Sequence, residues 1–557
     1  MQISWIDFGI IVFYFVFTIG VGWYLKKFTR TSEDFFLAGR ECGAWMAGLA
    51  FLSANMGSLE LLGWSASAYQ YGIIATHWYW VGAIPAMLFL ALFMMPFYHI
   101  SKTHSVPGFL KLRYNEASRL LSAISFAIMT LLASGISMYS MGLVLATMLG
   151  WDFDYSILIS AGTVAVYVAF AGLTSAIFNE IIQFFLIWFG ALLIPVIGII
   201  EVGGWDNLVT LVGQRVAVMG KSGDFMHLWS SMGSYSDNPM GLHWLGIVLG
   251  LGWVVSFGYW TTDFLVVQRV FAAKDLRSAK MAPVIASFFK MAIPFIVILP
   301  GLIGIAVLPE LKPADSGVFD MNSYNAVLPL LMKRYFAPGL LGIGITALLA
   351  SFMSGQAGNI SAFATVWTYD IYRALIYKNG SDHHYLNMGR ICTIVGIIVS
   401  IGSAYVVMHF ASIMDYMQAL FSFFIAPLFG TILLGMFWSW ITPWGGFWGL
   451  LAGTLSSFTM FILLKFSLIE GKWIAFSNGA SDMAQNMWRA WWAWCITVVI
   501  TIVVSWVTAP KPLQELKGLV YGLTEVEKES SYPLLKRPLF WAAISIVLFL
   551  ILNIIFF

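Results

Sequence analysis

The amino-acid sequence predicts an all-α integral membrane protein with about 14 transmembrane helices. We expect two inverted five-helix repeats with discontinuous first helices, plus peripheral helices. Three observations lead to this prediction: the composition, the sidedness of the basic residues, and two interrupted apolar segments. Of the 557 residues, 60% are hydrophobic and 10% are charged, whereas soluble domains average roughly 45–50% and about 25%. The composition therefore excludes a soluble protein, and no basic tract indicates a nucleic-acid partner.

A helix that crosses a bilayer needs roughly 20 apolar residues, and we count fourteen such segments in the chain. The connection at 172–179 is barely polar, so thirteen spans is the alternative count. No cysteine spacing indicates a metal site or a disulfide framework. The predicted spans are 3–25, 42–68, 74–98, 119–148, 154–172, 180–203, 241–268, 281–307, 338–368, 391–409, 412–437, 444–465, 489–508 and 538–557.

The loops between these spans differ in charge. Alternate loops, counted from the first, carry twenty Lys and Arg residues, and the remaining loops carry eight. Because basic loops tend to stay in the cytoplasm, we expect both termini on the non-cytoplasmic side of the plasma (inner) membrane. A wrong number of spans would disrupt the alternation, so the pattern also favours an even number.

The segments 42–68 and 241–268 each contain residues that weaken a regular helix. The first has FLSANMGSLE at 51–60, and the second has several glycines, of which Gly258 directly precedes the expected break. At membrane depth, irregular backbone is tolerated only where it is buried in protein or lines a cavity. Broken helices of this kind bind ions and small solutes in secondary transporters.

The second broken segment comes five spans after the first, so the two cross the membrane in opposite senses, as an inverted repeat requires. We therefore predict one transporter domain over 1–557. Its parts are a peripheral helix at 3–25, repeats at 42–203 and 241–437, and accessory helices at 444–557. The stretch 204–240 is rich in Gly, Ser and Asp, and we predict an external loop there.

Ionisable residues inside spans need a physical reason, because each costs roughly 2.5–3.5 kcal/mol on insertion scales. Lys290 lies deep in the segment 281–307. It is either a pocket cation or gate, or a snorkelling or structurally paired lysine. Glu60 is its natural partner in sign. Glu180, Asp263 and Asp415 lie closer to span ends, where we expect structural pairing.

A small cation requires several oxygen ligands in a dry site. Backbone carbonyls freed near Ser53 and Met56, with the hydroxyls of Ser351 and Ser354, would supply them. Small residues on one helix face are equally typical of close helix packing, so both readings of the serines stay open. Tyr259 and Trp260, which are adjacent, also have alternative readings: they stack on a ring of the solute, close a gate, or serve ordinary packing.

Taken together, the motifs resemble the sodium/solute symporter family, which contains the sodium/glucose cotransporters. The resemblance covers nearly the whole chain, and its motifs are specific only in combination. They are DFFLAGR at 34–40, FLSANMGS at 51–58, YWTTDFLVVQR at 259–269, ASFMS at 350–354, DIY at 370–372 and DYMQ at 415–418.

The resemblance implies sodium-driven uptake on a fold of two inverted five-helix repeats. It places the family's sodium site on the carbonyls of Ser53 and Met56 and on the hydroxyls of Ser351 and Ser354. Where the family has a second adjacent serine, this chain has Gly355. One expected hydroxyl ligand is therefore missing.

The resemblance also implies a sugar pocket. Tyr259 keeps the aromatic ring that stacks beneath the sugar as an inner gate. Tyr79 stands where sugar carriers have a carboxylate, and Glu60 stands where they have His or Gln, so Glu60 is a candidate replacement for that carboxylate. The implied solute-binding positions are Asn55, Glu60, Tyr79, Ser256, Tyr259, Trp260, Lys290 and Gln418.

We therefore expect a secondary active transporter that couples sodium to the uptake of a sugar or related polyol by alternating access. The alternatives are a sodium- or proton-coupled symporter of a monocarboxylate, an amino acid or another small solute, and a non-transporting membrane solute sensor. No GxSxG motif or zinc-like pair is found in a span, so we do not expect an enzyme. The expected ligands are sodium, a small solute and membrane lipid, with no organic cofactor, and the oligomeric state is open.

Overall fold

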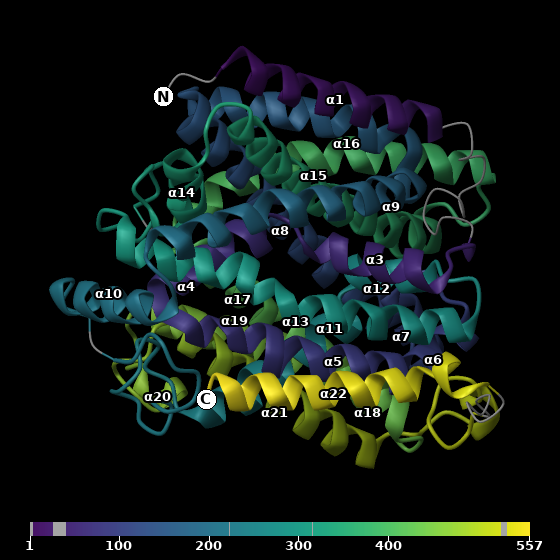
Figure 1. Cartoon of the computed structure of the whole chain (residues 1–557). Coiled ribbons are helices and arrows are strands. Elements are labelled where there is room, and N and C mark those ends of the chain that lie inside the picture. Colours follow the sequence, from purple (N-terminus) through teal and green to yellow (C-terminus); the bar gives the residue numbers. More distant parts are fainter. Residues whose placement is uncertain (1–3, 26–39, 222, 315, 525–531) are drawn as a thin grey trace.

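The computed structural model describes residues 4–25, 40–221, 223–314, 316–524 and 532–557, and the regular structure in these ranges is helical apart from isolated bridges. Long helices run side by side, and short helices and loops cover both ends of the bundle (Figure 1). Within these ranges, ten helices are long and apolar enough to cross a membrane, and three shorter apolar helices accompany them. One of the ten, Leu59–Ser101, contains the end of the second predicted span and all of the third. Each of the fourteen predicted spans therefore overlaps at least one of these helices, and most of the second span is the separate helix Ala44–Asn55.

The helices of the first part of the chain are α1 (Trp5–Leu25), α3 (Ala44–Asn55), η3 (Leu59–Gly63), α4 (Trp64–Tyr71), η4 (Gly72–Trp78), η5 (Tyr79–Ala83), α5 (Ile84–Phe89), η6 (Leu90–Met94), α6 (Met95–Ser101), α7 (Val106–Arg113), α8 (Glu116–Leu149), α9 (Phe153–Glu201) and α10 (Trp205–Val218). The middle part contains η7 (Gly246–Ser256), α11 (Phe257–Thr262), α12 (Phe264–Phe271), α13 (Leu276–Val307), η8 (Tyr324–Ala326), α14 (Val327–Tyr335), α15 (Leu340–Val366), η9 (Trp367–Ile376), α16 (Asp382–Val407), α17 (Ile413–Leu420), η10 (Phe421–Ile425) and α18 (Ala426–Phe437). The last part contains α19 (Pro443–Lys465), α20 (Lys472–Ala475), α21 (Asp482–Val507), η11 (Leu513–Leu516), η13 (Leu534–Lys536) and α22 (Pro538–Ile555).

The helix α9 covers both the fifth and the sixth predicted span. A straight helix of 49 residues would be about 74 Å long, far more than a bilayer requires. Its two ends nevertheless lie at the same face of the protein. Asp154 accepts a hydrogen bond from Tyr405 near the end of α16, and Glu201 pairs with Arg334 just before α15. Because α15 and α16 pack against each other and are joined by a short connection, the two ends of the range Phe153–Glu201 lie at one face, and this range does not run as one straight rod.

The prediction of a loop over 204–240 is wrong for its first part, where α10 forms. Leu208, Val212 and Val216 are buried at a spacing of four residues, and α10 packs on α13. This apolar stripe stabilises a surface helix even though the segment as a whole is polar. The remainder of the stretch contains turns and bends, as predicted.

The two broken helices are present, although the second break is not where the sequence indicated. The helix α3 ends at Asn55 because Met56 takes a non-helical conformation, and the chain resumes as η3 after Gly57 and Ser58. The second break was predicted after Gly258 but lies at Asp263, whose backbone is extended and whose side chain caps α12 by accepting a hydrogen bond from the Leu265 amide at 2.9 Å.

Gly258 is a packing residue. A Cβ atom at this position would lie only 2.6 Å from a methyl group of Ile425. The glycine therefore permits α11 to approach the helix that contains Ile425.

The two broken helices run in opposite directions. The Cys42 amide donates to the Ala272 carbonyl, and the Lys274 amide donates to the Cys42 carbonyl, each at 3.0 Å. The beginning of α3 therefore lies beside the end of α12, which is the arrangement of an inverted pair. The repeat bounds 42–203 and 241–437 remain a prediction.

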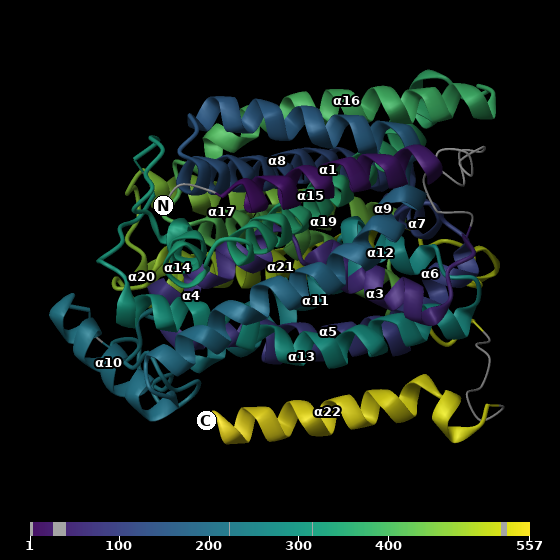
Figure 2. The ribbon, with the colours of Figure 1, turned by 45° about the horizontal axis from the view of Figure 1, so that its top comes forward.

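The start of α1 and the end of α22 lie at the same end of the bundle in both views (Figures 1 and 2). The short helices α10, α14 and α20 lie toward this end as well (Figure 1). An even number of spans requires this arrangement. The assignment of this end to the non-cytoplasmic side remains a prediction.

Candidate functional site

The eight residues predicted to bind the solute line a single cavity of about 40 Å³, which we call the central cavity. They come from the two broken helices, η5, α13 and α17, which are far apart in the sequence. Pockets that hold small ligands typically measure about 300–1,000 Å³. The central cavity is therefore closed around its own side chains and is much smaller than such a pocket.

Lys290 and Glu60 form a buried ion pair in this cavity. The Lys290 ammonium lies 2.7 Å from a Glu60 carboxylate oxygen, and both side chains are almost fully buried. The other Glu60 oxygen accepts a hydrogen bond from the Tyr79 hydroxyl. Breaking a buried ion pair by removing one partner typically costs about 3–5 kcal/mol, so the two charges hold α13 to the first broken helix.

The contact between Tyr79 and Glu60 bears on the expected carboxylate replacement. The Tyr79 hydroxyl contacts the Glu60 carboxylate in the cavity wall, although Tyr79 belongs to η5 and Glu60 to η3. The two positions are therefore neighbours in the cavity wall.

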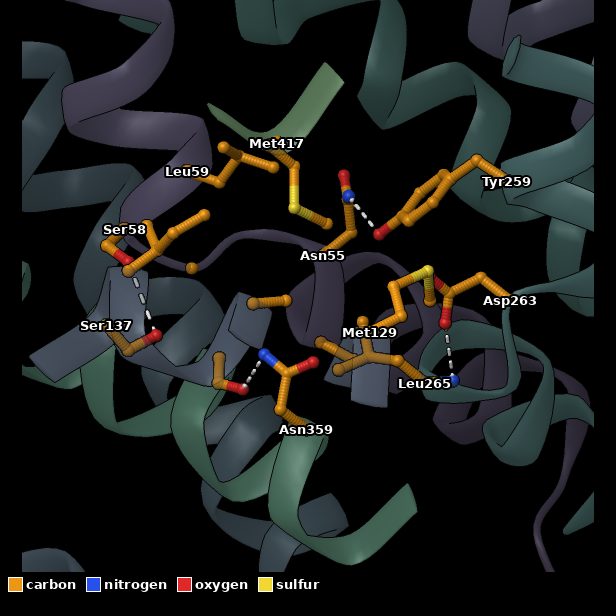
Figure 3. A pocket seen from close by; sticks show the side chains of 15 residues that line it. Asn55, Ser58, Leu59, Met129, Ser137, Tyr259, Asp263, Leu265, Asn359 and Met417 are labelled. Atoms are coloured by element: carbon orange, nitrogen blue, oxygen red, sulfur yellow. Dashed lines mark hydrogen bonds between the residues drawn. The ribbon is translucent and has the colours of Figure 1, made fainter. Parts of the chain in front are cut away.

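Asn55 links the ion pair to the second broken helix. Its side-chain oxygen accepts a hydrogen bond from Lys290, and its amide donates to the Tyr259 hydroxyl at 2.8 Å. Asn55 and Tyr259 also line a second small cavity of about 40 Å³ on the side of α12, which we call the inner cavity (Figure 3). This hydrogen bond therefore lies in the wall between the central cavity and the inner cavity.

The inner cavity has polar groups from both breaks. Ser58 and Asp263 line it, and so does Asn359 on α15, whose amide donates to the Gly355 carbonyl at 3.1 Å (Figure 3). If Asn55 and Tyr259 separated, the central cavity would continue into this polar space.

Aromatic rings form much of the wall of the central cavity. The Lys290 ammonium lies 4.7 Å from the centre of the Tyr79 ring and 5.1 Å from that of Trp260. Such cation–π contacts help to hold a buried ammonium. Sequence reasoning missed Trp64 and Trp78, whose rings also line this wall. Trp64 follows Glu60 by four residues, and this helical spacing is a signal that would have found it.

Gln418 lines the central cavity from α17. Its side-chain oxygen is buried and accepts no hydrogen bond from the residues that the structure describes. Met414 and Phe421, which sequence reasoning also missed, line the cavity from the same side as Gln418. An unsatisfied buried acceptor costs about 1–3 kcal/mol, so Gln418 is suited to accept a hydrogen bond from a bound solute.

The four residues predicted to bind the ion meet at the first break. The Ser351 hydroxyl donates to the Met56 carbonyl at 2.5 Å, and the Ser354 hydroxyl donates to the Ser53 carbonyl at 3.4 Å. The Met56 carbonyl, which the helix end releases, forms a cluster of oxygens with the two hydroxyls of α15 and with the Ser53 carbonyl, which also accepts a hydrogen bond from the Met56 amide at 2.9 Å. Oxygen ligands of this type suit a small hard cation.

Gly355 lies at the same contact. A Cβ atom there would lie 3.1 Å from the Gly57 Cα atom. The glycine therefore allows α15 to pack closely against the break.

Glu180 is adjacent to the oxygen cluster but is already paired. Its carboxylate forms a buried ion pair with Arg269 on α12, and the Ser53 hydroxyl donates to its backbone carbonyl at 2.7 Å. The guanidinium neutralises the carboxylate, so this charge serves the contact between α9 and α12. The structural pairing expected for Glu180 is thus confirmed.

Comparison with known proteins identifies the family of the chain. The sequence model of the sodium:solute symporter family matches residues 35–453. The chain is 28% identical over 476 residues to a sodium/glucose cotransporter of Vibrio parahaemolyticus, covering 83% of this chain and 86% of the relative. It is also 28% identical to a sodium/mannose cotransporter of Bos taurus, covering 83% of this chain and 80% of the relative.

Among solved structures, the fold is similar to that of a Na⁺-coupled sialic acid symporter in a substrate-bound outward-open state. The TM-score is 0.73 at 20% sequence identity, with 91% of this chain and 98% of that chain covered. Fold and site together define a multi-pass membrane transporter of the secondary active class. The chain belongs to the sodium:solute symporter family.

Proposed function

We propose that this protein is a sodium-coupled symporter of a sugar or related polyol, that the central cavity binds the solute, and that the protein works by alternating access. The observation that carries the proposal is the set of paired and polar groups in the central cavity. Lys290 and Glu60 neutralise each other there, and Asn55 and Gln418 add amide donors and acceptors. The cavity therefore has no net charge but many hydrogen-bonding groups, which suits a neutral, hydroxyl-rich molecule.

Aromatic rings complete the match to a sugar. Tyr259 and Trp260 lie edge to face with ring centres 5.2 Å apart, and Tyr259 also packs against Phe421. A sugar ring has apolar C–H faces and a polar edge, so it fits between such rings and the surrounding polar groups. A monocarboxylate would instead leave Glu60 as a repulsive neighbour. The relatives named for glucose and mannose support the same solute class.

The backbone near Asn55 connects the expected sodium site to the central cavity. Asn55, which lines the central cavity, stands in the sequence between Ser53 and Met56, whose carbonyls belong to the oxygen cluster. An ion bound to these carbonyls would fix the end of α3 and, with it, the position of Asn55. By reciprocal linkage, sodium then tightens solute binding and solute tightens sodium binding by the same factor.

Alternating access requires the partition at Tyr259 to open after the outer side has closed. The Asn55–Tyr259 hydrogen bond lies between the central and inner cavities (Figure 3). Loss of sodium from the first break would release Asn55 and weaken this bond. Charge sidedness supports a plasma (inner) membrane protein with both termini outside the cytoplasm.

The test is a thermal-shift screen of the purified protein against sugars, polyols and carboxylates, with sodium or with potassium as the matched cation. We expect stabilisation by a sugar or polyol that is larger in sodium. Stabilisation by carboxylates alone would contradict the solute class, and equal shifts in the two salts would contradict the coupling.

A further inference from the structure

A third cavity, of about 250 Å³, lies outside the site described so far. It is enclosed by α17, α19, α21 and the segment after α16, and we call it the outer cavity. Exposed residues line it together with deeply buried ones. Its ionisable and amide lining includes Asp415, Lys465, Asp482, Gln485, Asn486 and Arg489.

Arg489 is a buried cation that forms no ion pair within the part of the chain that the structure describes. Its side chain is 2% exposed, and its guanidinium lies 5.0 Å from the ring centres of Phe423 and Phe461. Nε donates to the Ser422 hydroxyl at 2.9 Å, and Nη2 donates to the Asn486 side-chain oxygen. No ion pair joins it to a carboxylate among the described residues, and Nη1 has no hydrogen-bond acceptor there.

Asp415 is a buried carboxyl group that forms no ion pair with a Lys or Arg among the described residues. It is 1% exposed, and its two oxygens accept hydrogen bonds from neutral hydroxyls, Ser412 at 2.8 Å and Tyr71 at 3.4 Å. No Lys or Arg of the described ranges forms an ion pair with it. The structural pairing that we expected for Asp415 from the sequence is therefore not formed with a Lys or Arg of the described residues.

Asp415 and Arg489 thus line one cavity with opposite charges and do not pair with each other. Each buried charge is costly unless it is paired. A molecule that carries both a carboxylate and an ammonium group satisfies the two at once, whereas a simple acid or a simple amine satisfies only one.

We propose that the outer cavity binds a small zwitterion of amino-acid size, with its carboxylate on Arg489 and its ammonium group on Asp415. The volume is slightly below the roughly 300 Å³ at which pockets for drug-sized ligands begin, which suits a small molecule. Lys465 and Asp482, at the exposed rim, repeat the same pair of charges. This inference does not rest on the proposed sugar transport.

The outer cavity shares one helix with the central cavity. Met414 and Gln418 of α17 line the central cavity, and Asp415 and Ala419 line the outer cavity from the neighbouring face. A zwitterion in the outer cavity therefore contacts the helix that carries Gln418. Reciprocal linkage would make its affinity depend on the solute in the central cavity.

The test measures Kd by calorimetry on the purified full-length protein. The zwitterionic probes are glycine, L-alanine and L-proline, and the matched probes with a single charge are acetate, propionate and propylamine. We expect at least one zwitterion to bind at least tenfold more tightly than every matched acid and amine. Binding of all probes with equal affinity, or of none, would overturn the proposal.

Two variants locate the site. Arg489→Gln should weaken zwitterion binding at least tenfold, and Asp415→Asn should remove the preference for alanine over propionate. Arg334→Gln, which removes an exposed arginine, is the matched control and should change nothing. If Arg489→Gln does not fold, the change of preference in Asp415→Asn still decides. A contrary outcome is that Gln418→Ala abolishes zwitterion binding and Asp415→Asn leaves it intact. The zwitterion would then bind in the central cavity, which would contradict the proposal.

Discussion

The buried pair of Lys290 and Glu60 makes the sharpest prediction about stability. In Glu60→Gln, the glutamine can still accept the Tyr79 hydrogen bond, but Lys290 remains 2% exposed with its charge uncompensated. We expect a loss of about 3–5 kcal/mol in the free energy of unfolding. Adding Lys290→Met removes the stranded charge, so the double variant should regain at least about 2 kcal/mol.

The assay is unfolding of solute-free protein in detergent, so that lost solute binding does not enter the result. The pair Arg334–Glu201 has the same 2.7 Å distance, but its side chains are 44% and 39% exposed. Glu201→Gln should therefore cost no more than about 1 kcal/mol. Equal costs for Glu60→Gln and Glu201→Gln, or strictly additive single changes at Glu60 and Lys290, would refute the reasoning.

Further predictions concern the solute, the gate, the ion and the packing. Gln418→Ala should raise the sugar Kd by roughly three- to tenfold, since a hydrogen bond contributes about 0.5–1.5 kcal/mol, and calorimetry checks this; an unchanged Kd would remove Gln418 from the site. Tyr259→Phe should keep most of the affinity, because only the hydrogen bond to Asn55 is lost, whereas Tyr259→Ala should lose at least tenfold; equal losses would contradict a role for the ring. Ser354→Ala should raise the sodium concentration for half-maximal uptake without changing which sugar is transported, and an unchanged concentration would argue against the oxygen cluster. Gly258→Leu should lower stability by about 1–3 kcal/mol through overpacking, measured as the unfolding midpoint, and a neutral result would contradict the close approach to the neighbouring helix.

Chemical complementarity within the sequence predicted the centre of the site. A lysine too deep to reach the membrane surface and a glutamate in a broken helix require each other on energetic grounds, and Lys290 and Glu60 do pair. The two breaks were predicted from composition, but the second was misplaced, because Gly258 serves helix packing and Asp263 caps the new helix. Composition cannot separate a glycine that breaks a helix from one that permits close contact.

The sequence analysis missed features that depend on contacts between residues far apart in the sequence. The stripe of Leu208, Val212 and Val216 was overlooked because the polar residues around it dominate the composition of the stretch 204–240. Arg489, the first residue of the predicted span 489–508, was not singled out, because nothing near it in the sequence shows that residues of η10 and α19 pack against it. Only the tertiary arrangement reveals that it faces a cavity.

Uptake of a radiolabelled sugar into proteoliposomes tests the central claim most directly. With an inward sodium gradient, the account predicts that the sugar identified by thermal shift accumulates above its external concentration, and that Lys290→Met abolishes this accumulation. With an equal potassium gradient, only equilibration or less should occur. Identical uptake under the two gradients would contradict sodium-coupled transport through the central cavity.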